Sequence, residues 1–373
     1  MVAGEASGDL LASLLLKGLH EQGVSWKAAG VGGPHMVAQG FDAWWSSSQL
    51  SVRGYVEVLR RYRSLVRLRR DLGERWLRER PDIFVGVDAP DFNLELAKRL
   101  KQQGIKTAHF VCPSIWAWRP ERVALIREAV DHVLCIFPFE VALLEKHEIR
   151  ATYVGHPIAQ MLPLEPDQLA AQRRLAIQPE DCEIVALLPG SRVSEIAHLM
   201  PRFLAAAKLM LKARPKLRFV LPAVPALREL IDKQIEQHGS GLPLLVFNGN
   251  SHVCMAACDV ALVASGTATL EVALSKRPMV IAYHMPRVSW WIHQRKRLQP
   301  WVGLPNILAE EFLVPEFLQE QATPQNLAEA TLAWLDSPDQ TRALYDAFVL
   351  MHHSLSADTP AVSARVIGEV ISG

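Results

Sequence analysis

The sequence predicts an α/β protein made of two doubly wound domains that face each other across a cleft. Short apolar segments alternate with amphipathic segments of helical period along most of the chain, which is typical of parallel sheets built from strand–helix–strand units. A chain of 373 residues is longer than one core normally fills, so two domains are expected. The proline-containing segment Leu162–Pro166 separates residues 1–165 from residues 166–344, and the helical tail 345–373 is expected to pack back on the first domain.

The strands of the first domain are short apolar segments with helical patterns between them. The predicted strands are Asp82–Val87, Thr107–Val111, His132–Ile136 and Thr152–Val154, and the predicted helices are Leu10–Gln22, Glu95–Gln103 and Arg122–Ala129. Met1 and Val2 directly precede a glycine-containing turn, Ala3–Asp9, of a kind that normally follows a whole strand. The first strand is therefore expected to be truncated, either as a stub or because translation starts upstream.

The second domain repeats this alternation. Its predicted strands are Ile184–Leu188, Arg218–Leu221, Leu244–Phe247, Val260–Val263 and Met279–Ala282, and its predicted helices are Asp167–Ala176, Glu195–Leu211, Pro225–Gln237, His252–Ala257 and Thr269–Leu274. Ligands of doubly wound sheets bind outside the carboxyl ends of the strands. The turns that follow the strands are therefore the first places to look for functional residues.

Composition excludes several classes of function. Forty basic residues against thirty-nine acidic ones give a net charge of +1, so nothing indicates nucleic-acid binding. The five cysteines are odd in number and lack zinc-site spacing, which favours reduced thiols in a cytoplasmic protein without a metal site. No apolar run reaches the roughly 18 residues of a spanning helix, and no signal-peptide pattern precedes the first motif.

The turn after the first strand of the second domain has the chemistry of an anion site. The apolar run Ile184–Leu188 ends in Pro189-Gly190-Ser191-Arg192, and a helix follows at once. The free N–H groups and positive dipole end of that helix favour an anion. Ser191 adds a hydroxyl donor, and Arg192 adds a planar cation that can bind two phosphate oxygens. An ordinary turn with a solvated arginine is the alternative.

A second turn of this kind follows the strand Val260–Val263. Ser265, Gly266 and Thr267 form a glycine turn, and Glu271 lies about one turn into the next helix. A carboxylate at this position can accept hydrogen bonds from the vicinal hydroxyls of a ribose. The two turns together predict a nucleotide site in the second domain.

The first domain offers a candidate general base. Asp88 is the first residue after the strand Asp82–Val87, where a carboxylate can take a proton from an attacking hydroxyl, although a loop cap is the alternative. The Ala3–Asp9 turn brings Ser7 toward the same cleft. Hydride transfer and ATP hydrolysis fit poorly, because the sequence has neither GxGxxG in a dinucleotide context nor a Walker lysine.

For each of three further segments, two interpretations stay open. Trp116, Trp118 and Arg119 after a strand suit either an acceptor pocket or a satellite core. Residues 53–80 contain ten arginines and four acids above an apolar stripe, which suits either an anionic bilayer or a solvated outer helix. The segment 288–298, with Trp290, Trp291 and nearby Trp301, suits either a membrane interface or an ordinary surface helix.

Seven motifs together resemble the lipid-A-disaccharide synthase family. They occur in the same order, over nearly the whole chain, at Gly4–Asp9, Gly86–Asn93, Pro113–Arg119, Val154–Pro157, Leu187–Arg192, Ala264–Glu271 and Leu304–Asn306. The resemblance implies a metal-independent, inverting glycosyltransferase with two Rossmann-like domains (the GT-B architecture) and no cofactor. It also implies a cytoplasmic, peripheral protein of the Gram-negative inner membrane, which condenses UDP-2,3-diacylglucosamine with 2,3-diacylglucosamine 1-phosphate to a β-1,6-linked disaccharide and UDP.

The same resemblance implies roles for individual residues. Ser191 and Arg192 would hold the pyrophosphate of the UDP-sugar, with Ser265, Gly266, Thr267 and Ser7 nearby. Glu271 would accept from the ribose, Asn306 would help to close the donor site, and Asp88 would be the catalytic base. The truncated first strand is the one departure from the family pattern, and Ser7 lies in the turn that follows it.

Three alternatives remain on the sequence alone. One is another UDP-N-acetylglucosamine-type glycosyltransferase, and one is a UDP-sugar 2-epimerase. The third is a catalytically inactive nucleotide-binding protein attached to membranes. The expected partners are the two acylated sugars and an anionic membrane surface, with no nucleic acid, and a homodimer stays open.

Overall fold

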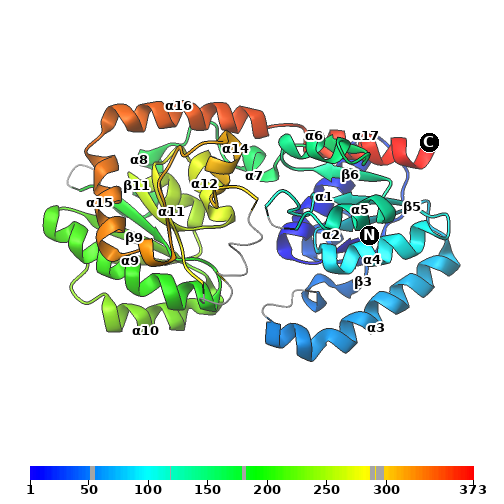
Figure 1. The fold of residues 1–373 in the computed structure, drawn as a ribbon, viewed down its shortest axis with the longest axis horizontal. Helices are drawn as coiled ribbons and strands as arrows, with labels where there is room; N and C mark the ends of the chain where they lie inside the picture. The colour runs from blue at the N-terminus through cyan, green and yellow to red at the C-terminus, as the bar shows by residue number, and fades with distance from the viewer. Residues whose placement is uncertain (51–54, 118, 179–181, 286–289, 291–297) are drawn as a thin grey trace. The chain divides into compact units, whose positions relative to one another are not determined.

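The computed structural model describes the chain except for residues 51–54, 118, 179–181, 286–289 and 291–297 (Figure 1). The described part forms two compact units, one of Met1–Pro157 with Leu355–Gly373 and one of Ile158–Ser354. Each unit is a parallel sheet with helices packed against it, which confirms the predicted α/β fold class.

The first unit contains a seven-stranded parallel sheet in the order β3-β2-β1-β4-β5-β6-β7. Its strands are β1 (Val2–Ala3), β2 (Ala29–Gly32), β3 (Asp42–Ser46), β4 (Ile83–Val87), β5 (Lys106–Phe110), β6 (His132–Cys135) and β7 (Ala151–Tyr153). Its helices are α1 (Ala6–Glu21), α2 (Pro34–Ala38), α3 (Tyr55–Glu79), α4 (Pro90–Lys101), α5 (Arg122–Ala129), α6 (Phe139–Glu145) and α17 (Thr359–Ser372), and α7 (Pro157–Met161) begins at the end of the unit. Strand β1 has two residues, and both of its neighbours, β2 and β4, pair with it.

The strand order reverses between β1 and β4. The chain winds outward through β2 and β3 on one side and through β5 to β7 on the other. Such a topological switch point leaves a crevice outside the carboxyl ends of the two central strands. The residues that follow β1 and β4, which begin with Gly4 and Asp88, therefore lie at this crevice.

The last helix of the chain packs on the first helix. Gly18 of α1 lies so close to α17 that a Cβ on Gly18 would be 1.9 Å from the carbonyl oxygen of Pro360. The Gln22 side chain donates to the carbonyl of Ala361 at 2.9 Å. The C-terminal segment thus returns to the unit in which the chain begins.

The second unit contains a six-stranded parallel sheet in the order β10-β9-β8-β11-β12-β13. Its strands are β8 (Ile184–Leu188), β9 (Arg218–Ala223), β10 (Leu244–Asn248), β11 (Val260–Ala264), β12 (Met279–Tyr283) and β13 (Glu316–Leu318). Its helices are α8 (Gln168–Arg174), α9 (Val193–Ala213), α10 (Arg228–His238), α11 (Ser251–Ala257), α12 (Thr267–Leu274), α14 (Leu304–Ala309), α15 (Pro324–Leu335) and α16 (Pro338–Leu355). Its switch point lies between β8 and β11, the two strands that precede the predicted nucleotide turns.

Burial explains why β8 and β11 are the central strands. All five residues of each are buried, so both faces of these strands are covered, as continuous apolar runs in parallel sheets predict. The apolar stripe of α9, which includes Ile196, Phe203 and Met210, packs in the same core. The turns that follow β8 and β11 therefore start from fully buried strands.

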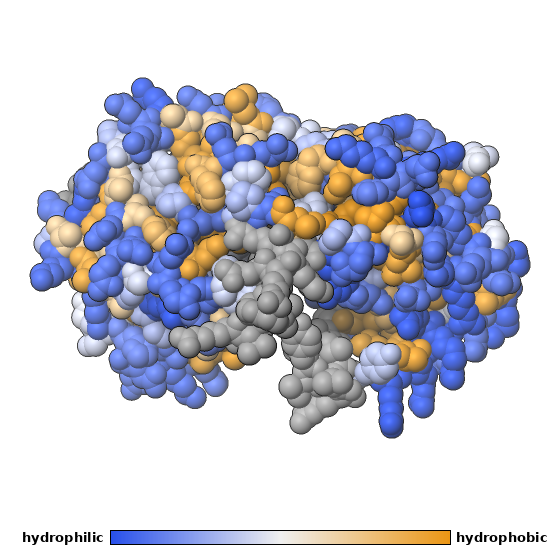
Figure 2. Space-filling model, viewed as in Figure 1, coloured by the Kyte–Doolittle hydropathy of each residue, from blue (hydrophilic) through white to orange (hydrophobic). Residues whose placement is uncertain are grey.

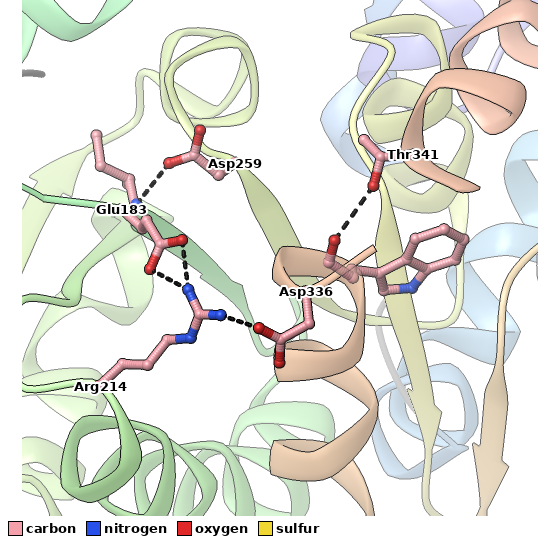
Figure 3. Close-up of polar contacts among 7 residues, drawn as sticks. Glu183, Arg214, Asp259, Asp336 and Thr341 are labelled. Carbon is pink, nitrogen blue, oxygen red and sulfur yellow. Dashed lines mark hydrogen bonds and ion pairs between the residues drawn. The ribbon is translucent and has the colours of Figure 1, made fainter. Parts of the chain in front are cut away.

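A polar network lies at the opposite, amino-terminal end of this sheet (Figure 3). The guanidinium of Arg214 binds both carboxylate oxygens of Glu183 at 2.6 and 2.7 Å and also pairs with Asp336. Asp259 accepts from the backbone N–H of Ile184 at 2.7 Å. Arg214 binds two carboxylates and Asp259 binds the backbone of β8, which indicates that these groups stabilise the fold at the end of the sheet away from the crevice.

Three strands lie outside the sequence prediction. Strand β2 contains two glycines, β3 is mostly solvent-exposed, and β13 is a three-residue edge strand, so none has the apolar run typical of a central strand. Among the described residues, no helix is long and apolar enough to span a membrane.

Candidate active site

The turn after β8 already holds an anion, the side chain of Glu195. Its carboxylate accepts from the backbone N–H groups of Ser191 at 2.9 Å and Arg192 at 3.2 Å. The Arg192 guanidinium donates to the other oxygen at 3.1 Å. A glutamate at the N3 position, three residues after the N-cap residue Arg192, often caps a helix N-terminus in this way. The donors of this turn are thus oriented toward negatively charged oxygen, which in this structure is the carboxylate of Glu195.

Gly190 is required by this arrangement. Its φ is +113°, and a Cβ there would lie 2.4 Å from a carboxylate oxygen of Glu195. Only glycine adopts this conformation readily and leaves room for the carboxylate. The Arg192 side chain is 73% exposed, so its guanidinium is accessible to a ligand.

The turn after β11 lies beside the first turn, because β8 and β11 are hydrogen-bonded neighbours. Gly266 has a φ of +151°, and the exposed Thr267 begins α12. The Ser265 hydroxyl donates to the carbonyl of Val302 at 2.9 Å, so this side chain fixes the backbone just before α14. The Glu271 carboxylate is mostly buried and pairs with His252 at 3.3 Å. The two turns of the second unit thus bring together six of the predicted donor-site residues: Ser191, Arg192, Ser265, Gly266, Thr267 and Glu271.

Asn306 is fully buried on α14. Its amide nitrogen donates to the carbonyl of Val314 and to the carboxylate of Glu316, both at 2.9 Å, and its oxygen accepts from Val314 N–H at 3.0 Å. Glu316 in turn accepts from the backbone N–H of Val302 and Gly303. The fully buried Asn306 side chain therefore supports the backbone at Val302 and Gly303 through Glu316.

In the first unit, Asp88 follows β4 at the switch point. Asp88 and Ala89 have φ values of +52° and +43°, which are uncommon for residues other than glycine. Burial raises the pKa of the Asp88 carboxyl; a hydrogen bond from Ala89 N–H opposes this shift, and the negative charge of Glu5 adds to it. The carboxyl is half-buried in a turn where the backbone departs from its usual range, a combination that often marks functional sites.

The buried amide of Asn93 holds this turn. Its nitrogen donates to the carbonyl of Asp88 at 2.8 Å and lies 3.3 Å from the carbonyls of Val2 and Val87. One side chain thereby connects the ends of β1 and β4 with the candidate base. The sequence places Asn93 within a motif but gives no sign of a contact with a residue 91 positions away.

The residues that follow β1 divide into structural and accessible ones. Asp9 is buried, and its carboxylate accepts from the backbone N–H groups of Gly33 at 2.9 Å, His35 at 2.9 Å and Met36 at 3.1 Å, which stabilises the start of α2. Ser7 is exposed in the first turn of α1. Of the two, Ser7 is the residue that a ligand at the switch point can reach.

The segment after β5 is held from two sides. The Trp116 indole N–H donates to the buried Glu140 carboxyl at 3.0 Å, and its ring packs edge-on against Phe139 at 5.3 Å. Arg119 pairs with Asp91 of α4 at 3.5 Å. Trp118 lies outside the described residues. Trp116 therefore belongs to a small aromatic cluster at the carboxyl end of the sheet.

Burial dominates the electrostatics of this cluster. It raises the pKa of Glu140 to about 8, against the opposing hydrogen bonds from Trp116 and Phe137. It also lowers the pKa of the nearby His156 to about 4. Both side chains are thus predominantly neutral at pH 7. Among the described residues, no group of three or more histidine, cysteine, aspartate and glutamate side chains has the geometry to hold a metal ion.

Comparison with known proteins identifies the family. The family model described as Lipid-A-disaccharide synthetase matches residues 1–358. The lipid-A-disaccharide synthase of Albidiferax ferrireducens is 57% identical over 378 aligned positions, which cover 100% of this chain and 97% of that protein.

Solved structures show the same fold at low identity. A putative UDP-N-acetylglucosamine 2-epimerase from Listeria monocytogenes matches with a TM-score of 0.63 at 12% identity, covering 100% of this chain and 94% of that chain. Acinetobacter baumannii MurG matches with a TM-score of 0.57 at 14% identity, covering 99% and 98%. Such identities support the two-sheet GT-B-like fold alone. With the family model and the full-length relative, the chain belongs to the lipid-A-disaccharide synthase family, the glycosyltransferases of lipid A biosynthesis.

Proposed function

We propose that this protein condenses UDP-2,3-diacylglucosamine with 2,3-diacylglucosamine 1-phosphate by an inverting displacement. The first unit supplies the acceptor site and the second unit the UDP-sugar site. The observation that carries the proposal is the placement of the motifs: a nucleotide-type pair of turns follows β8 and β11, and a half-buried carboxylate follows β4. Both places are topological switch points, where doubly wound sheets bind their ligands.

In the proposed reaction the 6-hydroxyl oxygen of the acceptor attacks the anomeric carbon of the donor. The bond between that carbon and the phosphate oxygen breaks, and UDP leaves with the bonding electrons. Asp88 takes the hydroxyl proton, and its raised pKa makes it a stronger base than an ordinary aspartate. Inversion follows because the attacking oxygen and the leaving group lie on opposite faces of the sugar ring.

Arg192 and the N-terminus of α9 supply positive charge to the departing UDP. The Arg192 guanidinium is exposed and already binds a carboxylate, the side chain of Glu195, so its geometry suits an oxyanion. Ser191 would donate its hydroxyl to the pyrophosphate. Thr267, exposed as the first residue of α12, lies where it can do the same. Glu271 would accept hydrogen bonds from the ribose hydroxyls. Gly266 adds no side chain where α12 begins, and Ser7, exposed on α1 of the first unit, would contribute its hydroxyl to the UDP-sugar.

Turnover of both substrates tests this proposal directly. The purified protein is incubated with the two diacylglucosamine substrates, and UDP and disaccharide are measured over time. Equimolar UDP and β-1,6-linked disaccharide, with no UDP when the acceptor is omitted, is the expected result. A folded protein that binds UDP but forms no UDP from UDP-2,3-diacylglucosamine would contradict the proposal. It would favour an inactive nucleotide-binding protein. Conversion of UDP-N-acetylglucosamine to its 2-epimer would favour an epimerase.

We further propose that the protein works on the cytoplasmic side of the Gram-negative inner membrane and that α3 contacts anionic lipid. The second half of α3 has a conventional buried stripe of Leu68, Leu72 and Trp76. Nearer its start, Tyr62 is 60% and Val66 is 38% exposed, and arginines flank them. Hydrophilic side chains project from the edge of the first unit where α3 lies (Figures 1 and 2). Exposed apolar groups between arginines suit a headgroup region.

The tryptophan segment around Trp290 and Trp291 has most of its residues, 291–297, outside the described part of the chain. At its end Leu298 is 54% exposed, and Phe312, which packs near Trp301, is 60% exposed. These apolar side chains support the same proposal.

Sedimentation with lipid vesicles tests the role of α3. Tyr62→Ser with Val66→Ser should reduce binding to vesicles that contain anionic lipid, whereas Val37→Ser, a change at another exposed valine, should not. Equal binding of wild type and the double variant would contradict the proposal for α3.

A further inference from the structure

His252 and Glu271 come from different helices of the second unit and meet beside its two proposed nucleotide turns. His252 is the second residue of α11, which follows β10, and Glu271 lies within α12, which follows β11. Their Nε2 and Oε2 atoms are 3.3 Å apart. The Glu271 side chain is 20% exposed and that of His252 is 41% exposed, so the carboxylate is the more enclosed partner.

We propose that His252 is a positioning residue that holds the Glu271 carboxylate in the orientation that binds the ribose hydroxyls of the donor. This inference rests on the proposed role of Glu271. A carboxylate has about four lone-pair sites, and two vicinal hydroxyls require two of them in a fixed direction. The imidazole uses one site on Oε2 and restricts rotation of the carboxylate, which leaves Oε1 for the ribose.

The surroundings of His252 favour this role over simple packing. The imidazole lines a mostly apolar cavity of about 330 Å³ with Val253, Ala256 and Leu274. Arg174 and Asp167 line the same cavity, and Asp167 caps α8 by accepting from Ala170 N–H. Within this mostly apolar lining, the imidazole makes a directed polar contact with the Glu271 carboxylate.

The Glu271 helix is held independently of His252. Ser275 at its end donates its hydroxyl to the Glu271 carbonyl at 2.9 Å, and Thr269 accepts from Leu304 N–H at 3.2 Å. Removal of the imidazole therefore leaves the helix in place and frees only the carboxylate. The expected defect is in recognition of the ribose, not in folding.

The test compares two nucleotides that differ only in the ribose. Binding of UDP and of 2′,3′-dideoxyuridine diphosphate is measured by calorimetry for wild type, His252→Ala, His252→Gln and the control His238→Ala, an exposed histidine at the end of α10. His252→Ala should weaken UDP binding about fivefold to tenfold, the value of one or two ordinary hydrogen bonds, and leave the dideoxy nucleotide unaffected. His252→Gln, which keeps an N–H donor, should restore most of the affinity. In turnover, the donor KM should rise while kcat stays constant.

A double-mutant cycle separates failure of this inference from failure of the proposed site. In a Glu271→Ala background, His252→Ala should add no further loss of UDP affinity. If Glu271→Ala alone leaves UDP binding unchanged, the proposed ribose contact is wrong and the inference falls with it. If Glu271→Ala weakens UDP binding while His252→Ala weakens both nucleotides equally or neither, the ribose contact stands and the inference about His252 is overturned.

Discussion

The side chain of Asn93 donates a hydrogen bond to the backbone carbonyl of Asp88 at 2.8 Å. This contact fixes a turn in which Asp88 and Ala89 both have positive φ. Residues in sparsely populated backbone regions persist only where their surroundings hold them. The orientation of the candidate base therefore depends on a side chain in the next helix.

Replacement of Asn93 should lower turnover without changing nucleotide affinity. Asn93→Ala removes the amide N–H donor of Asn93. The carbonyls of Val2 in β1 and Val87 in β4 then lack this hydrogen-bond partner, which should reduce the free energy of unfolding by about 1–3 kcal/mol. The measurement is kcat beside UDP affinity and a urea titration. A folded variant with wild-type kcat would show that Asp88 does not need this support.

Which parts of the site could be predicted from the sequence depends on how far apart the interacting residues lie along the chain. The turns at Ser191 and Ser265 were predictable because an apolar run, a glycine and a helical pattern are all local signals. The contact of Asn93 with Val2 and the pair of His252 with Glu271 were not, because they join residues far apart in the sequence. Such contacts exist only once the strands take their places in the sheet.

The same reasoning explains what the sequence missed in the fold. Strands β8 and β11 are buried on both faces, so their residues are continuously apolar. Strand β2, Ala29–Gly32, is short and rich in glycine, and its position depends on pairing with β1 and β3. Tertiary pairing, rather than local pattern, makes it a strand.

Loss of Arg192 should weaken UDP binding. Arg192→Ala removes an exposed charged donor at the turn after β8, where we propose that the pyrophosphate binds. Hydrogen bonds to charged groups contribute about 1.5–3 kcal/mol each, which corresponds to a loss of roughly 10- to 150-fold. Arg365→Ala, at an exposed arginine that pairs with Glu369 on α17, is the matched control. Calorimetry with UDP measures the difference, and equal affinities for wild type and Arg192→Ala would remove Arg192 from the phosphate site.

The buried Glu140 carboxyl predicts how stability depends on pH. Its pKa is about 8 in the folded protein against an ordinary 4.5, so between these values the folded state binds the proton more tightly than the unfolded state. Stability should therefore fall as the pH rises from 4.5 to 8 and then level off for this group. Glu140→Gln, which keeps an acceptor for Trp116, should lose less stability over this window.

Urea titrations at pH 5 and pH 8 measure this difference. Wild type should lose more unfolding free energy between the two pH values than Glu140→Gln. An identical loss in both proteins would show that the carboxyl of Glu140 titrates normally.

The contact between α1 and α17 should tolerate no side chain at Gly18. Gly18→Ala places a Cβ 1.9 Å from the Pro360 carbonyl oxygen, so α17 must shift. Overpacking of this kind costs about 1–3 kcal/mol. The melting temperature of Gly18→Ala should fall, whereas that of Gly368→Ala, where a Cβ meets nothing within 4 Å, should not. A Gly18→Ala protein as stable as wild type would contradict the close packing of these helices.

Asp88 is the proposed base that accepts the proton of the acceptor hydroxyl. The most direct measurement is turnover of the two diacylglucosamine substrates by Asp88→Asn, with UDP affinity measured on the same preparation. The asparagine keeps the size of the side chain and cannot take the proton. General-base catalysis contributes about 10²- to 10⁴-fold, so turnover should fall by at least about 100-fold while UDP binds as in wild type. Turnover close to that of wild type would contradict the assignment of Asp88 as the base.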